Sequence, residues 1–446
     1  MTRKRLLTAV ALTAACVAVA GCGHFHNPFA GGPKSKYTGT GERIPIIALN
    51  DTLKPADALK GQEFYLPPPE PIADWPVPGG TLAQSVEHVD AGHDFAVAWR
   101  ERFGKGTTRT AHVTAPPVAA DGMVFVMDGQ ARVSAYDLAS GRSVWRNDLS
   151  AHGKRGHEAF GGGLAYADGK LYVSSGYRFV AALDGHSGHV QWRAPTDAPV
   201  HAAPTVAQGR VFVESTDDNL LTFDAATGAV GWTYQALTET ARILAASSPA
   251  VSGEAVVTSF ASGELVALQT SNGNGLWSTV LSKSSRNSAL SEIRDIPGRP
   301  VIYKGDVYAV SHSGVFDAVD LRTGAERWSL PVTSVTTPWA AGDVVYVTDT
   351  AGDVICIARE GGQVYWITDL NKGIKKPKDR AMWSGPVLAS NRLVLVSTKG
   401  QLAALDPKTG AVQRKLKLGS GGLLSPIAAN GYLYVATEGA DLIAIR

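Results

Sequence analysis

Short runs of alternating hydrophobic and polar residues recur in pairs along this chain. A turn-forming pair that contains glycine precedes alternating β-branched, aromatic and aliphatic residues at 121–126, 168–173, 208–213 and 430–435. Such a pair before an alternating run is typical of a β-hairpin. A second alternating run follows, for example at 132–137 and 401–406. The pattern therefore predicts consecutive antiparallel strands.

The second strand of most units ends in a recurring turn, Asp-x-x-[Ser/Thr]-Gly. This turn occurs at 137–141, 184–188, 224–228, 320–324 and 406–410. The aspartate side chain can accept hydrogen bonds from its own turn backbone, and the glycine accepts a positive φ. A tryptophan stands four residues after a turn glycine in the pairs Gly141/Trp145, Gly188/Trp192, Gly228/Trp232, Gly273/Trp277, Gly324/Trp328 and Gly362/Trp366.

The spacing of this tryptophan position determines the predicted architecture. Trp99 repeats the position upstream, Arg414 occupies it after Gly410, and successive positions lie 38 to 51 residues apart. Such a period is typical of propellers and solenoid arrays. Seven units carry a turn glycine; an eighth begins at Ser425 and lacks its last strand, which residues 95–99 can supply. We predict an all-β fold, an eight-bladed propeller of four-stranded antiparallel blades whose last blade is closed by an N-terminal strand.

The tryptophan series has two interpretations, blade packing or a platform on which a cofactor stacks. A residue supplied once per blade at one fixed position is typical of packing, with the ring buried between blades and the indole N–H paired. We favour packing. Seven of the ten tryptophans occupy this position, which leaves Trp75, Trp339 and Trp383 for other roles.

Residues 1–21 have the pattern of a secretion signal peptide, with a basic start and an apolar stretch at 6–19. The tetrapeptide Val-Ala-Gly-Cys at 19–22 resembles the bacterial lipobox, in which the signal is cut before the cysteine and the cysteine is acylated. An ordinary signal peptide with a chance cysteine is the alternative. Because Gly23 stands where inner-membrane lipoproteins tend to carry Asp, we expect Cys22 to anchor the protein by lipid in the outer membrane, facing the periplasm.

Composition and charge exclude several classes of function. Without the three basic residues of the signal, 39 Lys and Arg stand against 40 Asp and Glu, so nucleic-acid binding lacks electrostatic support. Only Cys22 and Cys356 lie outside the signal, and the sequence has no CxxC metal or haem motif. It also lacks an HExxH motif and a Ser/His/Asp arrangement that can be singled out. We predict no catalytic residues, no cofactor and no metal.

Residues 22–94 differ from the repeats in composition. Proline and glycine are concentrated at 65–71 and 75–80, as in extended, semi-rigid spacers. We therefore expect a signal peptide at 1–21, a lipidated Pro/Gly-rich tether at 22–94 and the propeller at 95–446.

Lipobox, proline-rich segment and eight tryptophan-bearing repeats together resemble the BamB family, the propeller lipoproteins of the outer-membrane β-barrel assembly (Bam) machinery. The resemblance covers about residues 95–446, and the repeat is also similar to that of pyrroloquinoline-quinone (PQQ) dehydrogenases. It implies a non-enzymatic scaffold that binds the POTRA domains of BamA and other Bam components. It further implies assistance to the insertion of outer-membrane proteins, including contact with their unfolded precursors.

Members of the BamB family bind BamA through two loops on one face. In the matching segments of this chain, Leu244 replaces the family's arginine, Asp295 keeps the first of two aspartates, and Pro297 stands at the second. An apolar patch with a charged rim suits such an interface. The alternative is that both segments are ordinary blade connections. The resemblance implies partner binding by Ala241, Arg242, Ile243, Leu244, Arg294 and Asp295.

Two other functions stay open. The resemblance to quinone-dependent dehydrogenases would imply a vicinal Cys-Cys ring and a Ca²⁺ site, whereas Cys22 and Cys356 are far apart in the sequence. A propeller that binds glycans or peptidoglycan would need aromatic residues lining its central funnel.

Overall fold

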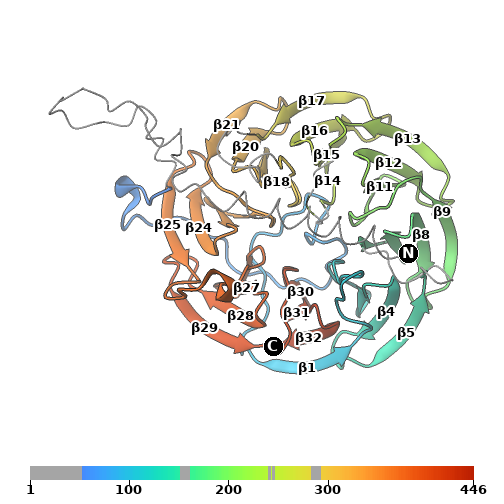
Figure 1. Ribbon diagram of the computed structural model, residues 1–446, viewed down its shortest axis with the longest axis horizontal. Helices are drawn as coiled ribbons and strands as arrows, with labels where there is room; N and C mark the ends of the chain where they lie inside the picture. Colours follow the sequence, from blue (N-terminus) through green and yellow to red (C-terminus); the bar gives the residue numbers. More distant parts are fainter. Residues whose placement is uncertain (1–52, 151–160, 240–242, 244–246, 283–292) are drawn as a thin grey trace, which may run out of the picture. The chain divides into compact units, whose positions relative to one another are not determined.

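The computed structural model describes residues 53–150, 161–239, 243, 247–282 and 293–446. Asp51–Arg446 form one compact unit. In this unit eight four-stranded antiparallel sheets follow one another around a ring, each sheet forming one blade (Figure 1). The helical segments among the described residues are short 3-10 turns, η1 (Asp57–Leu59) and η3 (Pro377–Asp379). The predicted all-β, eight-bladed propeller is confirmed.

Blades 1 to 4 each use four consecutive strands, numbered from the innermost to the outermost. Blade 1 consists of β2 (Val118–Ala120), β3 (Met123–Met127), β4 (Arg132–Asp137) and β5 (Ser143–Asp148). Blade 2 consists of β6 (Gly162–Ala167), β7 (Lys170–Ser175), β8 (Phe179–Asp184) and β9 (Val190–Pro195). Blade 3 consists of β10 (Thr205–Ala207), β11 (Arg210–Glu214), β12 (Asn219–Asp224) and β13 (Val230–Gln235). Blade 4 consists of β14 (Ala250–Ser252), β15 (Ala255–Ser259), β16 (Glu264–Gln269) and β17 (Gly275–Val280).

Blades 5 to 7 repeat this order. Blade 5 consists of β18 (Val301–Tyr303), β19 (Asp306–Val310), β20 (Phe316–Asp320) and β21 (Glu326–Leu330). Blade 6 consists of β22 (Trp339–Ala341), β23 (Val344–Thr348), β24 (Asp353–Ala358) and β25 (Val364–Asp369). Blade 7 consists of β26 (Val387–Ala389), β27 (Arg392–Val396), β28 (Gln401–Leu405) and β29 (Val412–Lys417).

Blade 8 is built from two distant parts of the sequence. Three of its strands are β30 (Ile427–Ala429), β31 (Tyr432–Ala436) and β32 (Asp441–Ile445), and the outermost is β1 (Val97–Arg102). The register places Trp99 opposite Ala444 and Arg102 opposite Asp441. The predicted closing strand is confirmed, although it runs over 97–102 rather than 95–99. Phe95 has a φ of 51°, so the backbone is not extended immediately before this strand.

The Asp-x-x-[Ser/Thr]-Gly turns have the predicted internal hydrogen bonds. At the first of them, Asp137 Oδ1 accepts from the amide and the hydroxyl of Ser140 at 2.8 and 2.6 Å. Gly141 donates to the Asp137 carbonyl at 2.9 Å and has a φ of 72°. The side-chain hydrogen bond from the turn's Ser or Thr is the main cause that lowers the carboxyl pKa of Asp137, Asp184, Asp224 and Asp320.

Every outer strand except β29 carries a tryptophan to the turn of the next blade. The Trp145 indole donates to the Gly185 carbonyl at 2.9 Å, and a Cβ on Gly188 would come within 2.5 Å of that ring. The packing interpretation is therefore confirmed, and the glycine is needed for space as well as for φ. Five other indoles donate to a backbone carbonyl at the equivalent turn position: Trp99 to Leu138, Trp192 to Ala225, Trp232 to Thr270, Trp277 to Leu321 and Trp328 to Arg359.

Arg414 replaces the tryptophan at the seam of the ring, where no complete turn exists. Its guanidinium donates to the Asp94 carbonyl at 2.9 Å and lies 5.9 Å from the centre of the Phe95 ring. The Gly92 amide donates to the Gly431 carbonyl, as the Leu138 amide does to Gly122 in blade 1. Residues 92–95 thus occupy the place of the missing turn, and an arginine replaces the indole that would have packed on it.

Residues 72–89, part of the predicted tether, run once around the inside of the ring, and we call them the inner belt. Figure 1 shows the belt in light blue inside the innermost strands. Innermost strands have free backbone groups on one edge, and the belt supplies partners for them. The belt is hydrogen-bonded to seven of the eight blades. The bonds are Asn430 N to Ile72 O (blade 8), Ala119 N to Trp75 O (blade 1), Tyr166 N to Pro76 O (blade 2), Val251 N to Leu82 O (blade 4), Ile302 N to Ala83 O (blade 5), Trp339 Nε1 to Glu87 O (blade 6) and Val89 N to Leu388 O (blade 7).

Buried apolar side chains hold the belt in place. Trp75 is 1% exposed, its indole donates to the Pro78 carbonyl, and its ring stacks on Trp339 with 6.3 Å between centroids. Val77 and Val89 are fully buried as well. The spacer interpretation is therefore wrong for residues 53–94, which pack against the propeller. Residues 22–52, including Cys22, lie outside the described residues, and for them the tether stays a prediction.

Trp328 and Trp366 allow a matched test of the indole hydrogen bond. They are 7% and 9% exposed; Trp328 donates to the Arg359 carbonyl at 2.7 Å, whereas no described residue accepts from Trp366 Nε1. We expect Trp328→Phe to lower the free energy of unfolding by about 1 kcal/mol more than Trp366→Phe. Only Trp328→Phe removes a hydrogen bond, and it leaves the Arg359 carbonyl without its donor. Urea denaturation of both variants measures the difference, and equal losses would contradict it.

The turn aspartates predict acid sensitivity. Because the pKa of Asp137, Asp184, Asp224 and Asp320 is lowered in the fold, the stability they contribute is present above about pH 4 and is lost as the pH falls below it. Burial raises the pKa of Asp353 to about 6. Ionisation of Asp353 above that pH therefore lowers the stability of the fold, which is the opposite effect.

A variant in which Asp137, Asp184, Asp224 and Asp320 are all replaced by Asn separates the effect of the turn carboxylates on the melting temperature from that of other groups. We expect the melting temperature of the wild type to fall more steeply below pH 4 than that of the variant, which keeps the turn acceptors but not their charge. Thermal melts between pH 7 and pH 2 provide the measurement, with the pH 7 values as the control for altered packing. Parallel curves would show that these carboxylates contribute nothing.

Candidate functional site

The two ends of the ring carry different loops. At one end lie the connections that lead into each innermost strand, such as 107–117 and 293–300, and the turns between second and third strands; we call this the entry face. The other end, the turn face, carries the first-to-second strand turns and the Asp-x-x-[Ser/Thr]-Gly turns. Both predicted partner-binding segments belong to the entry face, since they lead into β14 and β18.

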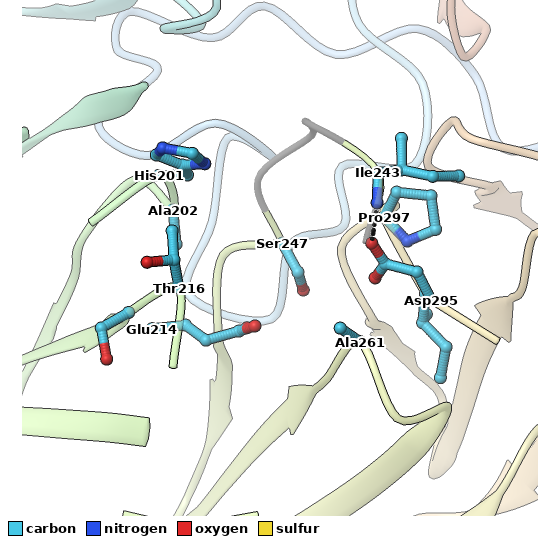
Figure 2. Close-up of a pocket in the computed structure, with 11 residues that line it drawn as sticks. His201, Ala202, Glu214, Thr216, Ile243, Ser247, Ala261, Asp295 and Pro297 are labelled. Atoms are coloured by element: carbon cyan, nitrogen blue, oxygen red, sulfur yellow. Dashed lines mark hydrogen bonds between the residues drawn. The ribbon is translucent and has the colours of Figure 1, made fainter. Parts of the chain in front are cut away.

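One hydrogen bond joins the two predicted segments. The Ile243 amide donates to Asp295 Oδ2 at 2.6 Å (Figure 2). Asp295 is buried and Arg294 is exposed. The Asp295 carboxylate therefore faces inward and positions Ile243, while Arg294 presents its charge to solvent. Ala241, Arg242 and Leu244 lie outside the described residues.

A small pocket lies beside this bond, between the entry-face loops of blades 3, 4 and 5. It measures about 20 Å³, room for about one water molecule. Figure 2 shows His201 and Glu214 on the side opposite Ile243 and Asp295, with Ser247 between them. The Ser247 hydroxyl lies 2.8 Å from that of Ser259. The sequence did not single out His201 or Glu214, because neither stands in a motif and only the ring brings them to the segment at 294–295.

A second, larger cavity of about 350 Å³ occupies the entry-face end of the central channel. We call it the cup. Pro78 of the inner belt lies in its wall, together with residues from the loops that lead into blades 1, 4, 5, 6, 7 and 8. Its apolar lining includes Val113, Pro297, Val335, Met382, Leu423 and Leu424. The described lining contains no Phe, Tyr or Trp, so the condition set for a glycan-binding funnel is not met by these residues.

Arg299 is the basic side chain of the cup that lacks a counter-charge. It lies between the cup and the belt, where it also contacts the space beside Trp75 and Gln84. Its Nε has no hydrogen-bond partner, and none of the ion pairs within the described part of the chain involves its guanidinium. Burial lowers the pKa of Arg299 to about 10, so the group remains charged at neutral pH.

The remaining predicted features are structural or untested. Cys356 is a free, buried thiol, and burial raises its pKa. Across residues 53–446, apart from the short undescribed stretches, no three His, Cys, Asp or Glu side chains gather as a metal site. No helix in the described residues is long and apolar enough to cross a membrane.

Comparison with known families adds a decisive match. The family model for outer membrane protein assembly factor BamB, built on PQQ-like repeats, matches residues 83–155, 129–368 and 373–446. The chain belongs to the BamB family. The match begins within the inner belt and continues to the last residue, so it covers every blade.

Individual relatives agree with this assignment. Outer membrane protein assembly factor BamB of Shewanella oneidensis is 25% identical over 358 residues, which is 78% of this chain and 88% of the relative. The crystal structure of BamB from Moraxella catarrhalis matches with a TM-score of 0.65 at 18% identity, covering 78% of this chain and 98% of that one. A europium-containing methanol dehydrogenase matches with a TM-score of 0.67 at 16% identity, covering 82% and 89%. At such identities the structural matches show a shared fold alone.

Proposed function

We propose that this protein is a non-catalytic scaffold lipoprotein of the Bam complex, which binds the POTRA domains of BamA and assists the insertion of outer-membrane proteins. The observation that carries the proposal is the BamB family match over residues 83–446. The similarity to methanol dehydrogenase supports a shared fold only. We therefore favour the scaffold over the dehydrogenase alternative.

The entry face is the surface that we assign to BamA. Ile243 is partly exposed and Arg294 is exposed beside it, which gives an apolar contact with a charged neighbour, as interface centres and rims require. The hydrogen bond from the Ile243 amide to Asp295 holds this residue in a defined position before a partner arrives. Preorganisation of this kind lowers the ordering cost of binding.

The route of the N-terminal segment supports the same choice of face. Residues that precede the belt contact the turn face: Tyr65 N donates to Asp343, and Lys408 pairs with Glu63. The described residues that precede the belt therefore lie along the turn face, at the end of the ring opposite the surface that we assign to BamA. The chain from Cys22 to Leu53 spans at most about 110 Å when fully extended.

The outer strands of the blades suit transient contact with unfolded precursors. They are edge strands, and an extended peptide can add to such an edge through backbone hydrogen bonds. Large apolar side chains on β5, β9, β13 and β17 are 43–68% exposed: Val144, Val190, Val230 and Leu276. We include strand addition at these edges in the proposed function.

The BamA interface is testable by charge substitution on one face. We expect the double variant Ile243→Glu/Arg294→Glu to recover about tenfold less BamA than wild type in affinity purification from solubilised envelopes, because loss of one interface anchor costs at least about 1.4 kcal/mol. Arg322→Glu, an exposed substitution in a turn-face loop, is the matched control. Equal recovery by the double variant and wild type would remove BamA from the entry face.

The lipid anchor is testable by cysteine substitution. We expect Cys22→Ala to move the protein from the membrane pellet to the soluble periplasmic fraction, because it removes the acylated residue and with it the hydrophobic attachment. Cys356→Ala removes a buried thiol and should leave fractionation unchanged. Retention of Cys22→Ala in the pellet after a high-salt wash would refute lipid anchoring.

A further inference from the structure

The inner belt changes what the central channel of this propeller can do. Its backbone is bonded to innermost strands around the ring, and Trp75, Val77 and Val89 fill the space beside them. The belt therefore occupies space along the inner wall of the ring (Figure 1). The cup opens on the entry face, and belt residue Pro78 lies in its wall.

Arg299 places an uncompensated positive charge in this cup. A guanidinium that protein surrounds loses hydration, and a fold normally repays that loss with a carboxylate partner or a full set of acceptors. Arg299 has neither among the described residues, and its Nε is enclosed without an acceptor. A charged side chain in that condition, facing a cavity, is a candidate ligand contact.

Glu438 and His112 are the other titratable groups of the cup lining. They lie close enough for His112 to lower the pKa of the Glu438 carboxyl, against the larger effect of burial, which raises it. Glu438 thus interacts with His112, whereas Arg299 has no carboxylate partner among the described residues.

We infer that the cup binds a small organic monoanion, a carboxylate with an apolar body, whose carboxylate pairs with Arg299 and whose body packs on Val335, Met382, Leu423 and Leu424. The planar guanidinium matches a carboxylate with two parallel hydrogen bonds. The volume of about 350 Å³ lies within the range of small-ligand pockets, roughly 300–1,000 Å³. Ligand binding here needs no Bam component, although Ile243 of the proposed BamA interface also lines the cup.

A pair of matched probes tests the inference on the purified full chain. The probes are 4-phenylbutyrate and its neutral amide, 4-phenylbutyramide, which differ in charge but hardly in shape. Isothermal titration calorimetry should show one site per chain with affinity for the acid at least about tenfold higher than for the amide, as expected for a charge-assisted hydrogen bond. Arg299→Gln should abolish this preference, and Arg299→Lys should retain part of it.

Two further variants keep the test independent of folding. Arg322→Gln, on the turn face, should bind both probes as wild type does. Leu423→Trp fills the cup without touching the charge and should weaken both probes together. Thermal melts check that each variant folds; Arg299→Gln should melt no lower than wild type, because it removes a buried charge without a partner. Equal affinity for acid and amide in the wild type, binding of neither probe up to 10 mM (roughly the weakest affinity of interest), or a preference that survives Arg299→Gln would each overturn the inference.

Discussion

The contact between an indole ring and a turn glycine of the next blade is the interaction on which the ring depends. In each case a tryptophan on an outer strand lies so close to a glycine that a methyl group there would come within 2.5–2.9 Å of the ring. The glycine is therefore constrained twice, by its positive φ and by the ring above it. Because the same strand also forms its own blade, every contact transmits the position of one sheet to the next, and large aromatic area is buried at each step.

The seam at blade 8 shows what this interaction requires. A turn cannot be continuous where the ring is joined by two separate chain segments, so residues 92–95 reproduce its backbone contacts and Arg414 substitutes for the indole. A guanidinium can donate to a carbonyl and stack on an aromatic ring at once. Arg414 thus provides both the hydrogen bond and the ring contact that tryptophan provides between the other blades.

The propeller was predictable because its repeat is local. Strand runs, turn aspartates and the tryptophan period all lie within about fifty residues of one another, and the missing strand of the last unit indicated closure by residues near Trp99. The inner belt was not predictable, since a proline-rich composition suits a free spacer and a strap on a surface equally well. Only contact with the innermost strands distinguishes the two, and the one local hint was the apolar character of Trp75, Val77 and Val89.

Partner binding by the candidate segments stays a prediction, and the sequence did not indicate how their side chains are oriented. The family resemblance indicated the segments that contain Ile243 and Asp295, and both lie on one face, joined by a hydrogen bond. The inward orientation of the Asp295 carboxylate could not be predicted from the sequence, because an aspartate in a loop is compatible with either orientation. Arg299 was missed for a related reason: a single arginine in a loop has no motif, and its lack of a carboxylate partner becomes visible only when the ring brings the surrounding loops together.

The pairing of β1 with β32 has a consequence for how the molecule is made. These strands are separated by nearly the whole length of the propeller, and pairings between remote segments form late, because the loop-closure entropy must be met first. A chain still emerging from a ribosome or a translocation pore lacks the second member of the pair. It therefore remains an open arc, and the circle is completed only after the C-terminal residues have been delivered.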